Sequence, residues 1–297
     1  MITNVAKERQ GIQSIEVGFR LLHVLCEAKH PMMLRDLAAA SGMPAAKAHR
    51  YLVSFMRTGL VEQNPATGRY DLGSYALELG LSSLGRLDPV RLAAPILDDL
   101  CEEIQESVAL AVWGNHGPTI VRIVDAGGPI AITMRTGALM SLTRSATGRV
   151  FAAFYRSPMM RQMVSEEIQE AATARKVAVT TIRRQLENTL ADIRSRGISR
   201  ASGAVNPGIN GFSVPVYDHT GAMIAAITSL GPLGEFDESW DSPIAEATRA
   251  AGRKLSARLG YGVMGDANDT APAAAESRRK KQSNETHKKG KARNNAG

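Results

Sequence analysis

The sequence contains no apolar run of the roughly 18 residues that a membrane-spanning helix needs. Its N-terminus, MITNVAKERQ, lacks the apolar core of a secretory signal peptide. We therefore expect a cytoplasmic protein with no membrane partner. The chain has only two cysteines, Cys26 and Cys101, which stand far apart in apolar helical patterns and without metal-ligand spacing. This favours two buried thiols over a disulfide.

Sequence motifs of known catalytic chemistry are also absent. There is no G-x-S-x-G, no H-E-x-x-H, no Walker phosphate loop and no Cys/His cluster. His116 and His219 lie beside the turns Gly117-Pro118 and Thr220-Gly221, where an exposed loop histidine is the ordinary case. We therefore expect no catalytic residue, no metal and no cofactor. An enzyme with a site that one sequence does not reveal is the alternative.

The net charge of +7 is concentrated at one end of the chain. From Glu276 onward there are eight Lys and Arg against two Glu, so this segment carries +6 and the rest only +1. Apolar residues are almost absent beyond Met264, so we expect 265–297 to be a disordered basic tail and 1–11 a mobile N-terminus. The tail would either attract DNA without sequence preference or only keep the protein in solution.

The stretch from Leu34 to Gly73 carries the clearest structural pattern. Gly42 and Pro44 mark a turn, because glycine suits a helix end and proline suits a first helical turn. On either side of this turn, apolar or small residues recur at helical spacing and predict two short helices. These residues are Leu34, Leu37, Ala38 and Ser41, then Ala48, Tyr51, Leu52 and Phe55. The pattern predicts a helix-turn-helix.

The second helix of this pair carries a basic and polar stripe, in which Lys47, Arg50, Ser54 and Arg57 follow at i, i+3, i+7 and i+10. In helix-turn-helix proteins such a helix enters the major groove of DNA. A solvated face of an ordinary helix pair is the alternative.

A predicted β-hairpin shifts the balance toward DNA binding. Two alternating segments, 60–63 and 69–72, flank the turn Asn64-Pro65-Ala66-Thr67-Gly68. A hairpin directly after a recognition helix is a wing, so we expect a winged helix that binds double-stranded DNA. The candidate DNA-binding residues are Lys47, His49 and Arg50 for the groove, Ser54 on the same face, and Arg57 and Arg69 for the backbone.

Two more helices are expected around this unit. Residues 12–28 predict a first helix, with Ile15, Phe19, Leu22 and Cys26 as its buried face. Residues 74–87 predict a linker helix with Leu77, Leu81 and Leu84 on one side. A single linker helix has nothing else to bury against, so we expect this stripe to pair with the same helix of a second copy, in a homodimer or a dimer of dimers.

The remaining chain, 88–264, predicts a second domain. A long helix over 90–108 precedes strands at 109–113, 119–126, 131–135, 211–218 and 222–230. Further helices are expected from Ser145, over 158–172, over 181–196 and over 242–259. Antiparallel strands with helices grouped around them indicate an α+β domain of the GAF/PAS-like sensor type. The expected fold class is thus multidomain: a winged helix-turn-helix over 12–73, a linker helix over 74–87 and this α+β domain.

The chain resembles the IclR family of bacterial transcriptional regulators over about Gly11 to Tyr261. The N-terminal resemblance rests on the LRDLA helix, the G-x-P turn, His49-Arg50, the GLVEQ strand and the GRYDLG wing. One departure is Ala45-Ala46, where the family usually has polar residues. In the second domain, Gly137, Ser141-Leu142 and Ala146-x-Gly148-Arg149 resemble the family's G-x-x-x-P-L-x-x-x-A-x-G-K segment, with Ser and Arg in place of Pro and Lys.

The resemblance implies a sequence-specific regulator whose operator binding is modulated by a small-molecule effector. Carried over by motif, the effector site would lie between one loop, one helix start and two strands. Its residues would be Gly137, Met140, Leu142, Ala146, Thr147, Gly148, Gly211, Phe212, Thr228 and Leu230.

The chain departs from family members that sense small polar acids. It has Ala201, Gly203 and Ala204 in place of acidic residues, Gly211 in place of Cys, and Leu230 in place of Ser. We therefore expect fewer polar groups and more volume, and an aromatic or aliphatic carboxylic acid held at the helix start. The alternatives are a site that has lost its ligand, an enzyme fused to a winged helix, and a non-specific DNA-binding protein that uses the tail.

Overall fold

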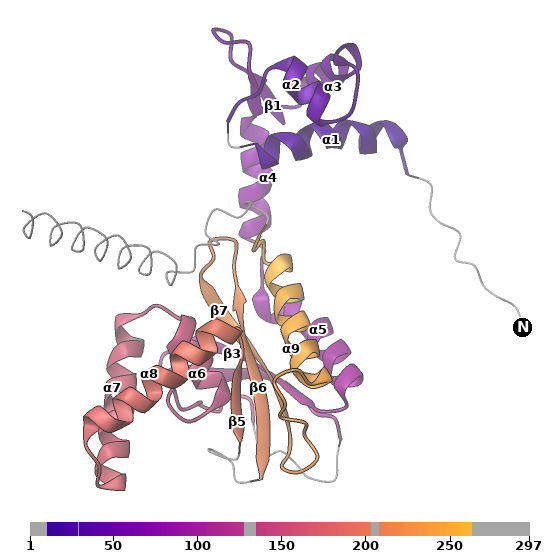
Figure 1. The fold of residues 1–297 in the computed structure, drawn as a ribbon. Helices are drawn as coiled ribbons and strands as arrows, with labels where there is room; N and C mark the ends of the chain where they lie inside the picture. Colours follow the sequence, from indigo (N-terminus) through magenta and orange to yellow (C-terminus); the bar gives the residue numbers. More distant parts are fainter. Residues whose placement is uncertain (1–10, 29, 128–134, 203–207, 263–297) are drawn as a thin grey trace, which may run out of the picture. The chain divides into compact units, whose positions relative to one another are not determined.

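The computed structural model describes residues 11–28, 30–127, 135–202 and 208–262 (Figure 1). Most of the expected mobile N-terminus, the basic tail and most of the expected strand at 131–135 lie outside these residues. Within them, no helix is long and apolar enough to cross a membrane.

The N-terminal part has the order helix, helix, helix, hairpin. Its elements are α1 (Gln13–Glu27), α2 (Leu34–Ala40), α3 (Ala45–Arg57), β1 (Val61–Gln63) and β2 (Tyr70–Leu72). Leu37 of α2 and Leu52 of α3 are fully buried in a common core with Leu21 of α1. Gly42, at φ +66°, turns the chain between α2 and α3, and Pro44 is the N-cap of α3. The expected helix-turn-helix is confirmed by these elements.

The buried face of α1 differs from the one that we expected. Leu22 is buried as expected, but Ile15 and Phe19 are each 54% exposed and Cys26 is also exposed, and Leu21 and Leu25 are buried instead. Apolar residues occupy both faces of this helix at helical spacing, so periodicity alone does not distinguish them. Gly18 decides the orientation, because a Cβ there would lie 2.9 Å from the Tyr51 ring, closer than van der Waals contact allows.

The wing is a three-segment antiparallel unit. β1 and β2 pair from Val61–Leu72 to Gln63–Tyr70. Met32 adds a bridge on the outer side of β2, where it exchanges two backbone hydrogen bonds with Tyr70 at 2.9 and 2.8 Å. At the tip, the Asn64 side chain accepts from the amides of Ala66 and Thr67. Local side-chain bonds therefore hold the shape of the loop.

Helix α4 (Ser74–Leu84) follows the wing directly, and none of its residues is buried in the single chain. Its start is fixed by backbone bonds from Gly73 to Leu60 and from Tyr75 to Gly59. Gly73 is itself buried, and a Cβ there would lie 2.3 Å from the Gly59 oxygen.

The C-terminal part is built on one antiparallel five-stranded sheet with the order β4-β3-β7-β6-β5 (Figure 1). The strands are β3 (Ser107–Gly114), β4 (Gly117–Val124), β5 (Ser199–Ser202), β6 (Ile209–Tyr217) and β7 (Met223–Pro232). The helices are α5 (Pro89–Ile104), α6 (Ala146–Phe154), α7 (Pro158–Arg175), α8 (Val179–Arg196) and α9 (Pro243–Arg258). Helices grouped on an antiparallel sheet confirm the expected α+β class.

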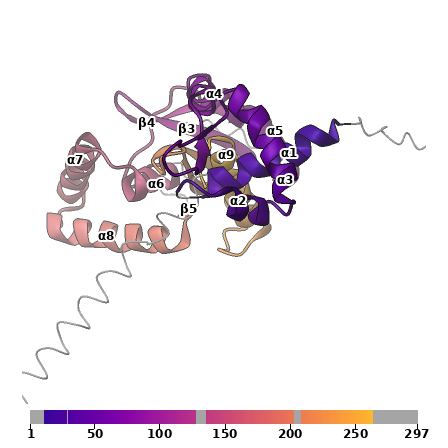
Figure 2. The same ribbon diagram turned by 90° about the horizontal axis from the view of Figure 1, so that it is seen from above.

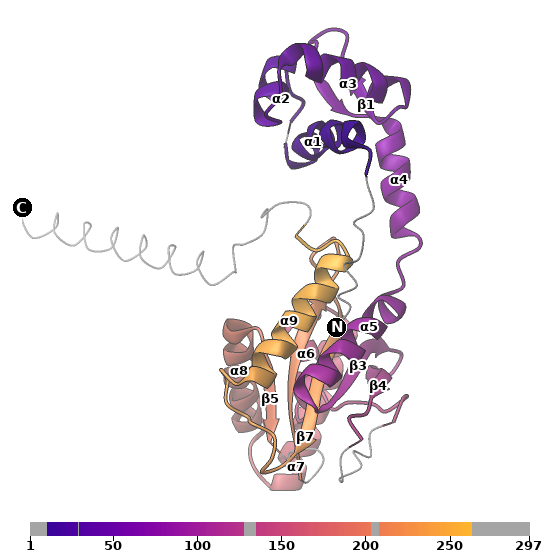
Figure 3. The ribbon, with the colours of Figure 1, turned by 90° about the vertical axis from the view of Figure 1, so that its right-hand side faces the viewer.

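Helices cover both faces of this sheet (Figure 3). On one face α5 and α9 pack on Phe212, Val214 and Ile227. On the other face α6 lies against the sheet, and α7 and α8 pack together beside it (Figure 2). Alternate residues of each strand therefore belong to different cores.

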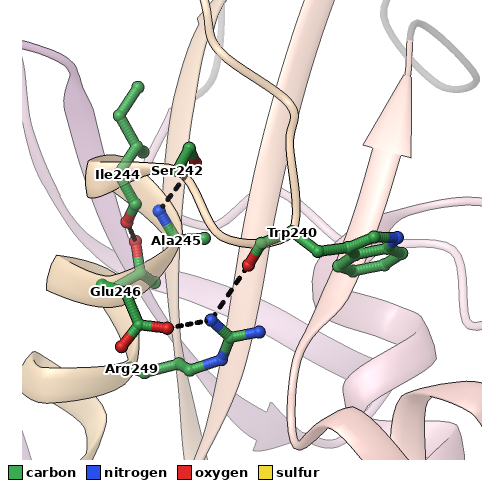
Figure 4. A network of polar contacts seen from close by, with 7 residues as sticks. Trp240, Ser242, Ile244, Ala245, Glu246 and Arg249 are labelled. Atoms are coloured by element: carbon green, nitrogen blue, oxygen red, sulfur yellow. Dashed lines mark hydrogen bonds and ion pairs between the residues drawn. The ribbon is translucent and has the colours of Figure 1, made fainter.

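The loop before α9 is attached to the first turns of that helix (Figure 4). The Ser242 hydroxyl caps the helix by accepting from the Ala245 amide at 3.2 Å. Arg249 pairs with Glu246 and donates to the Trp240 carbonyl oxygen at 3.0 Å.

The helix expected over 90–108, α5, ends earlier, at Ile104. Gln105 is left-handed at φ 55°, and Ser107 already begins β3.

We predict that Gly73→Ala lowers the stability of the winged helix, by about 1–3 kcal/mol, because the added methyl group overlaps the Gly59 backbone. Gly80→Ala in α4 is the matched control. No atom lies within 4 Å of a Cβ at Gly80, so alanine should stabilise the helix by about 0.5–1 kcal/mol. Thermal unfolding followed by circular dichroism checks both, and shifts of the same sign would contradict the packing at Gly73.

Candidate nucleic-acid interface and ligand site

The exposed face of α3 gathers most of the expected DNA-binding residues. Lys47, His49, Arg50, Ser54 and Arg57 are all exposed, while Ala48 and Leu52 on the opposite face are fully buried. Among the described residues, no carboxylate lies within ion-pair distance of the Lys or Arg side chains of this stripe. The Ser54 hydroxyl is engaged internally, since it donates to the Arg50 carbonyl oxygen at 3.2 Å. The stripe therefore presents unneutralised positive charge to solvent.

The start of α3 offers little hydrogen-bonding capacity of its own. The N-cap, Pro44, accepts no side-chain hydrogen bond, and the next two residues, Ala45 and Ala46, are exposed. Any direct reading of bases by this turn therefore falls to Lys47 and the residues after it.

Arg69 is placed on the wing, apart from the α3 stripe. Its side chain is exposed, and its Nη1 donates to the Pro31 carbonyl oxygen at 3.1 Å. Arg69 thus joins the wing to the segment before α2 while it still presents a cation at the surface. The sequence pattern did not indicate this structural contact.

The expected ligand site is centred on the first turn of α6. Ser145 caps this turn, and its hydroxyl accepts from the Gly148 amide at 2.8 Å. The amides of Ala146 and Thr147 have no acceptor in the described part of the chain, although these residues are 4% and 1% exposed. Buried amides without acceptors are rare in folded proteins, and at a helix start they favour an anion.

A chain of hydroxyl groups connects this helix turn to the sheet. Thr147 and Thr228 share a hydrogen bond of 2.8 Å, and Thr228 donates to Ser213 at 2.9 Å. All three residues are essentially buried. Because each hydroxyl has one hydrogen, Thr147 donates to Thr228. Sequence analysis missed Ser213, although its position at the third residue of the 211–218 segment places it on the same face as Gly211.

The expected loop residues run along the edge of the sheet. The Gly137 amide donates to the Ile120 oxygen, and the Met140 amide donates to the Pro118 oxygen. Leu142 is fully buried beneath α6. Gly148 makes this close approach possible, because a Cβ there would lie 1.9 Å from the Ser141 oxygen. The structure thus brings Leu142, the first turn of α6 and Thr228 together.

One expectation about this site needs correction. Phe212 does not belong to it, since its side chain lies on the opposite face of the sheet and contacts the rings of Phe236 and Trp240. The alternation of β6 places Gly211 and Ser213 toward α6 and therefore Phe212 away from it. At Gly211 the neighbouring strand approaches closely, since the Ser229 oxygen lies 2.8 Å and Leu230 Cδ2 lies 3.0 Å from where a Cβ would be.

The arrangement of the two domains indicates a class of protein. A winged helix-turn-helix with an exposed cationic recognition helix, followed by an α+β domain, is typical of DNA-binding regulators. Within the described residues, no group of three or more His, Cys, Asp or Glu is arranged to hold a metal ion.

Two known family models match the chain, one in each domain. The model of the IclR helix-turn-helix domain matches residues 14–65, and the model of the bacterial transcriptional regulator IclR C-terminal domain matches residues 81–257. The chain therefore belongs to the IclR family and is a DNA-binding transcriptional regulator.

Individual relatives are similar to this chain over nearly their whole length. The chain is 29% identical to the glycerol operon regulatory protein of Streptomyces griseus over 255 residues, covering 85% of this chain and 98% of the relative. It is 25% identical to the transcriptional repressor IclR of Escherichia coli K12, covering 85% and 91%. The crystal structure of Pseudomonas aeruginosa HmgR has a TM-score of 0.77 and 34% identity, covering 86% of this chain and all of that chain. The two named sequence relatives and both matching family models are transcriptional regulators, as the sequence predicted.

Proposed function

We propose that the protein binds a near-palindromic operator in the cytoplasm as a dimer, and that a small carboxylic acid modulates this binding. The single observation that supports it most is the exposed stripe of α3, whose cations have no ion-pair partner in the described part of the chain. Lys47, His49 and Arg50 would contact base edges, and Arg57 and Arg69 would contact phosphates. An effector that prefers one arrangement of the two recognition helices would shift the population of DNA-competent dimers.

We predict that Arg50→Ala lowers operator affinity and relaxes specificity, because it removes a contact to base edges. Arg69→Gln should weaken binding to all sequences alike and reduce the slope of log K against log salt by about one unit, because one phosphate contact is lost. Glutamine removes the charge and is two bonds shorter than the arginine Nη1 that contacts the Pro31 carbonyl, so an unchanged thermal unfolding temperature is required to show that the wing is intact.

Fluorescence anisotropy with the DNA upstream of the protein's own gene and a shuffled duplex, over a salt series, measures these effects. Arg183→Ala, which removes an exposed cation of α8, serves as the control. Equal losses on both duplexes for the two variants would contradict the roles given to Arg50 and Arg69. Loss of all binding on removal of residues 265–297 would favour the non-specific alternative.

The chemistry around the first turn of α6 supports an acid with an apolar body as effector. The free amides of Ala146 and Thr147 suit a carboxylate, while Leu142 and Leu230 line the same region with apolar atoms. Gly211 and Leu230 contribute no polar side chain. An aromatic or aliphatic acid would match these apolar neighbours better than a small polar acid would.

Titration calorimetry tests this ligand class. We expect benzoate or octanoate to bind more tightly than glyoxylate, and Thr147→Pro, which removes one of the two free amides, to weaken the binding. Thr147→Ala, which loses the same hydroxyl group but keeps the backbone amide, is the matched control. Tight binding of glyoxylate with none of either larger acid would contradict the proposal.

Helix α4 supports the dimer. Leu77 is 65% exposed and Leu81 is 58% exposed, and these residues share one side of a helix that buries nothing in the single chain. Covering both leucines with the same helix of a second copy would remove this apolar surface from water.

We expect Leu77→Glu together with Leu81→Glu to shift the protein toward monomer, because the charges would be buried without partners. Analytical ultracentrifugation over a concentration series measures the change. Glu78→Gln on the same helix is the control. An unchanged association state in the double variant would show that α4 is not the contact surface.

A further inference from the structure

The segment just before α6 is held by an internal carboxylate. Glu167 of α7 accepts from the amides of Leu142 and Thr143 at 2.8 and 3.0 Å. It also accepts from the hydroxyls of Ser141 and Thr143 at 2.7 and 2.6 Å. Both carboxylate oxygens are used, and no Lys or Arg of the described residues pairs with them. This side chain contributes to none of the functions described above.

The opposite side of the same segment is held by a guanidinium. Arg149 of α6 donates from Nε to the Thr143 oxygen at 2.9 Å and from Nη1 to the Arg200 oxygen at 3.4 Å. No carboxylate lies within ion-pair distance of it in the described ranges. Burial lowers the pKa of this guanidinium. A half-buried cation that donates to two neutral carbonyl groups needs another source of compensation.

A continuous path of hydrogen bonds joins the two charges. Arg149 donates to the carbonyl of the peptide between Thr143 and Arg144, and the N–H of that peptide donates to the Ser141 hydroxyl at 3.2 Å. Ser141 in turn donates to Glu167 Oε2 at 2.7 Å. Every donor points from the cation toward the anion, so each bond polarises the next.

Ser141 and Arg149 are two positions at which this chain departs from the family pattern, where Pro and Lys stand. A proline at 141 has no hydroxyl and would interrupt the path. A lysine at 149 would offer a point charge in place of the fork that reaches two carbonyls. The two departures therefore belong to one arrangement.

We propose that Arg149 and Glu167 are opposite charges coupled through Ser141 and one peptide group, without direct contact, and that this coupled pair fixes residues 141–145 on α7. Both are positioning residues: they set the place of Leu142 and the first turn of α6, and through it the ligand affinity. The structural part of this proposal is independent of the proposed function, whereas the effect on ligand affinity rests on it.

Hydrogen exchange of the full-length protein without ligand tests the structural part. In Glu167→Gln one carboxylate oxygen becomes an NH2 group, so either the Leu142 or the Thr143 amide loses its acceptor, and exchange of at least one of them should rise about tenfold or more. Glu166→Gln is the matched control, because that exposed neighbour bonds only to Gln162. Equal protection in Glu167→Gln and the native protein would overturn the proposal.

A double-mutant cycle tests the bridge itself. The effects of Arg149→Lys and Glu167→Gln on the urea unfolding midpoint should be non-additive in the native background, although the two side chains share no direct bond. In a Ser141→Ala background they should become additive, because the path is cut. Additivity in the native background would overturn the bridge, and the exchange experiment decides if a double variant fails to fold.

Calorimetry with benzoate tests the effect on the ligand. Glu167→Gln should weaken binding about tenfold, while Glu166→Gln leaves it unchanged. A loosened segment with unchanged benzoate affinity would overturn the positioning role. If the native protein binds neither benzoate nor octanoate, the proposed ligand class has failed, and the exchange result still tests the bridged pair.

Discussion

The position of the first turn of α6 depends on one close approach, that of Gly148 to the backbone of Ser141 and Leu142. No side chain fits between them, so the helix and the preceding segment pack backbone against backbone. This contact places Thr147 over Thr228 and aligns the two free amides beside apolar side chains. Hydroxyl bonds to the sheet on one side, and Glu167 and Arg149 on the other, then hold the arrangement. Backbone packing therefore determines where the amides and hydroxyls of the site lie, as much as any single polar residue does.

In the DNA-binding part, the buried residues and the charged residues occupy different faces of the helices. Its core is small and is formed mainly by leucines from α1, α2 and α3, while the cations of α3 stay outside it and have no ion-pair partner among the described residues. Arg69 is the exception, because it also bonds to Pro31. A cation with a structural contact is already ordered, so its use on DNA would cost less side-chain entropy than that of a free Lys.

Local sequence patterns predicted the helix-turn-helix, the wing and the α+β class, because each rests on spacing and turn chemistry within a few residues. They failed where the outcome depends on contacts between distant segments. Ile15 and Phe19 fit a buried face as well as Leu21 and Leu25 do, and the choice depends on packing against the distant α2 and α3, including the close approach of Tyr51 to Gly18. Phe212 was predicted to line the site because its neighbours on the strand do. Side chains alternate along a strand, however, and Phe212 lies in the core on the opposite face of the sheet. Glu167 carries no motif, and its role arises only when α7 folds back onto 141–143.

Helix α4 has eleven residues and buries none of them in one chain. Isolated helices shorter than about 12–15 residues are marginal in water, and this one lacks an internal core to make up the difference. If a second copy covers its leucines, helix formation and association become a single equilibrium governed by mass action. The segment that connects the two parts of the chain would then be ordered at high protein concentration and frayed at low concentration. The concentration of the protein in the cell would then determine how firmly α4 connects the two parts of the chain when the protein binds DNA.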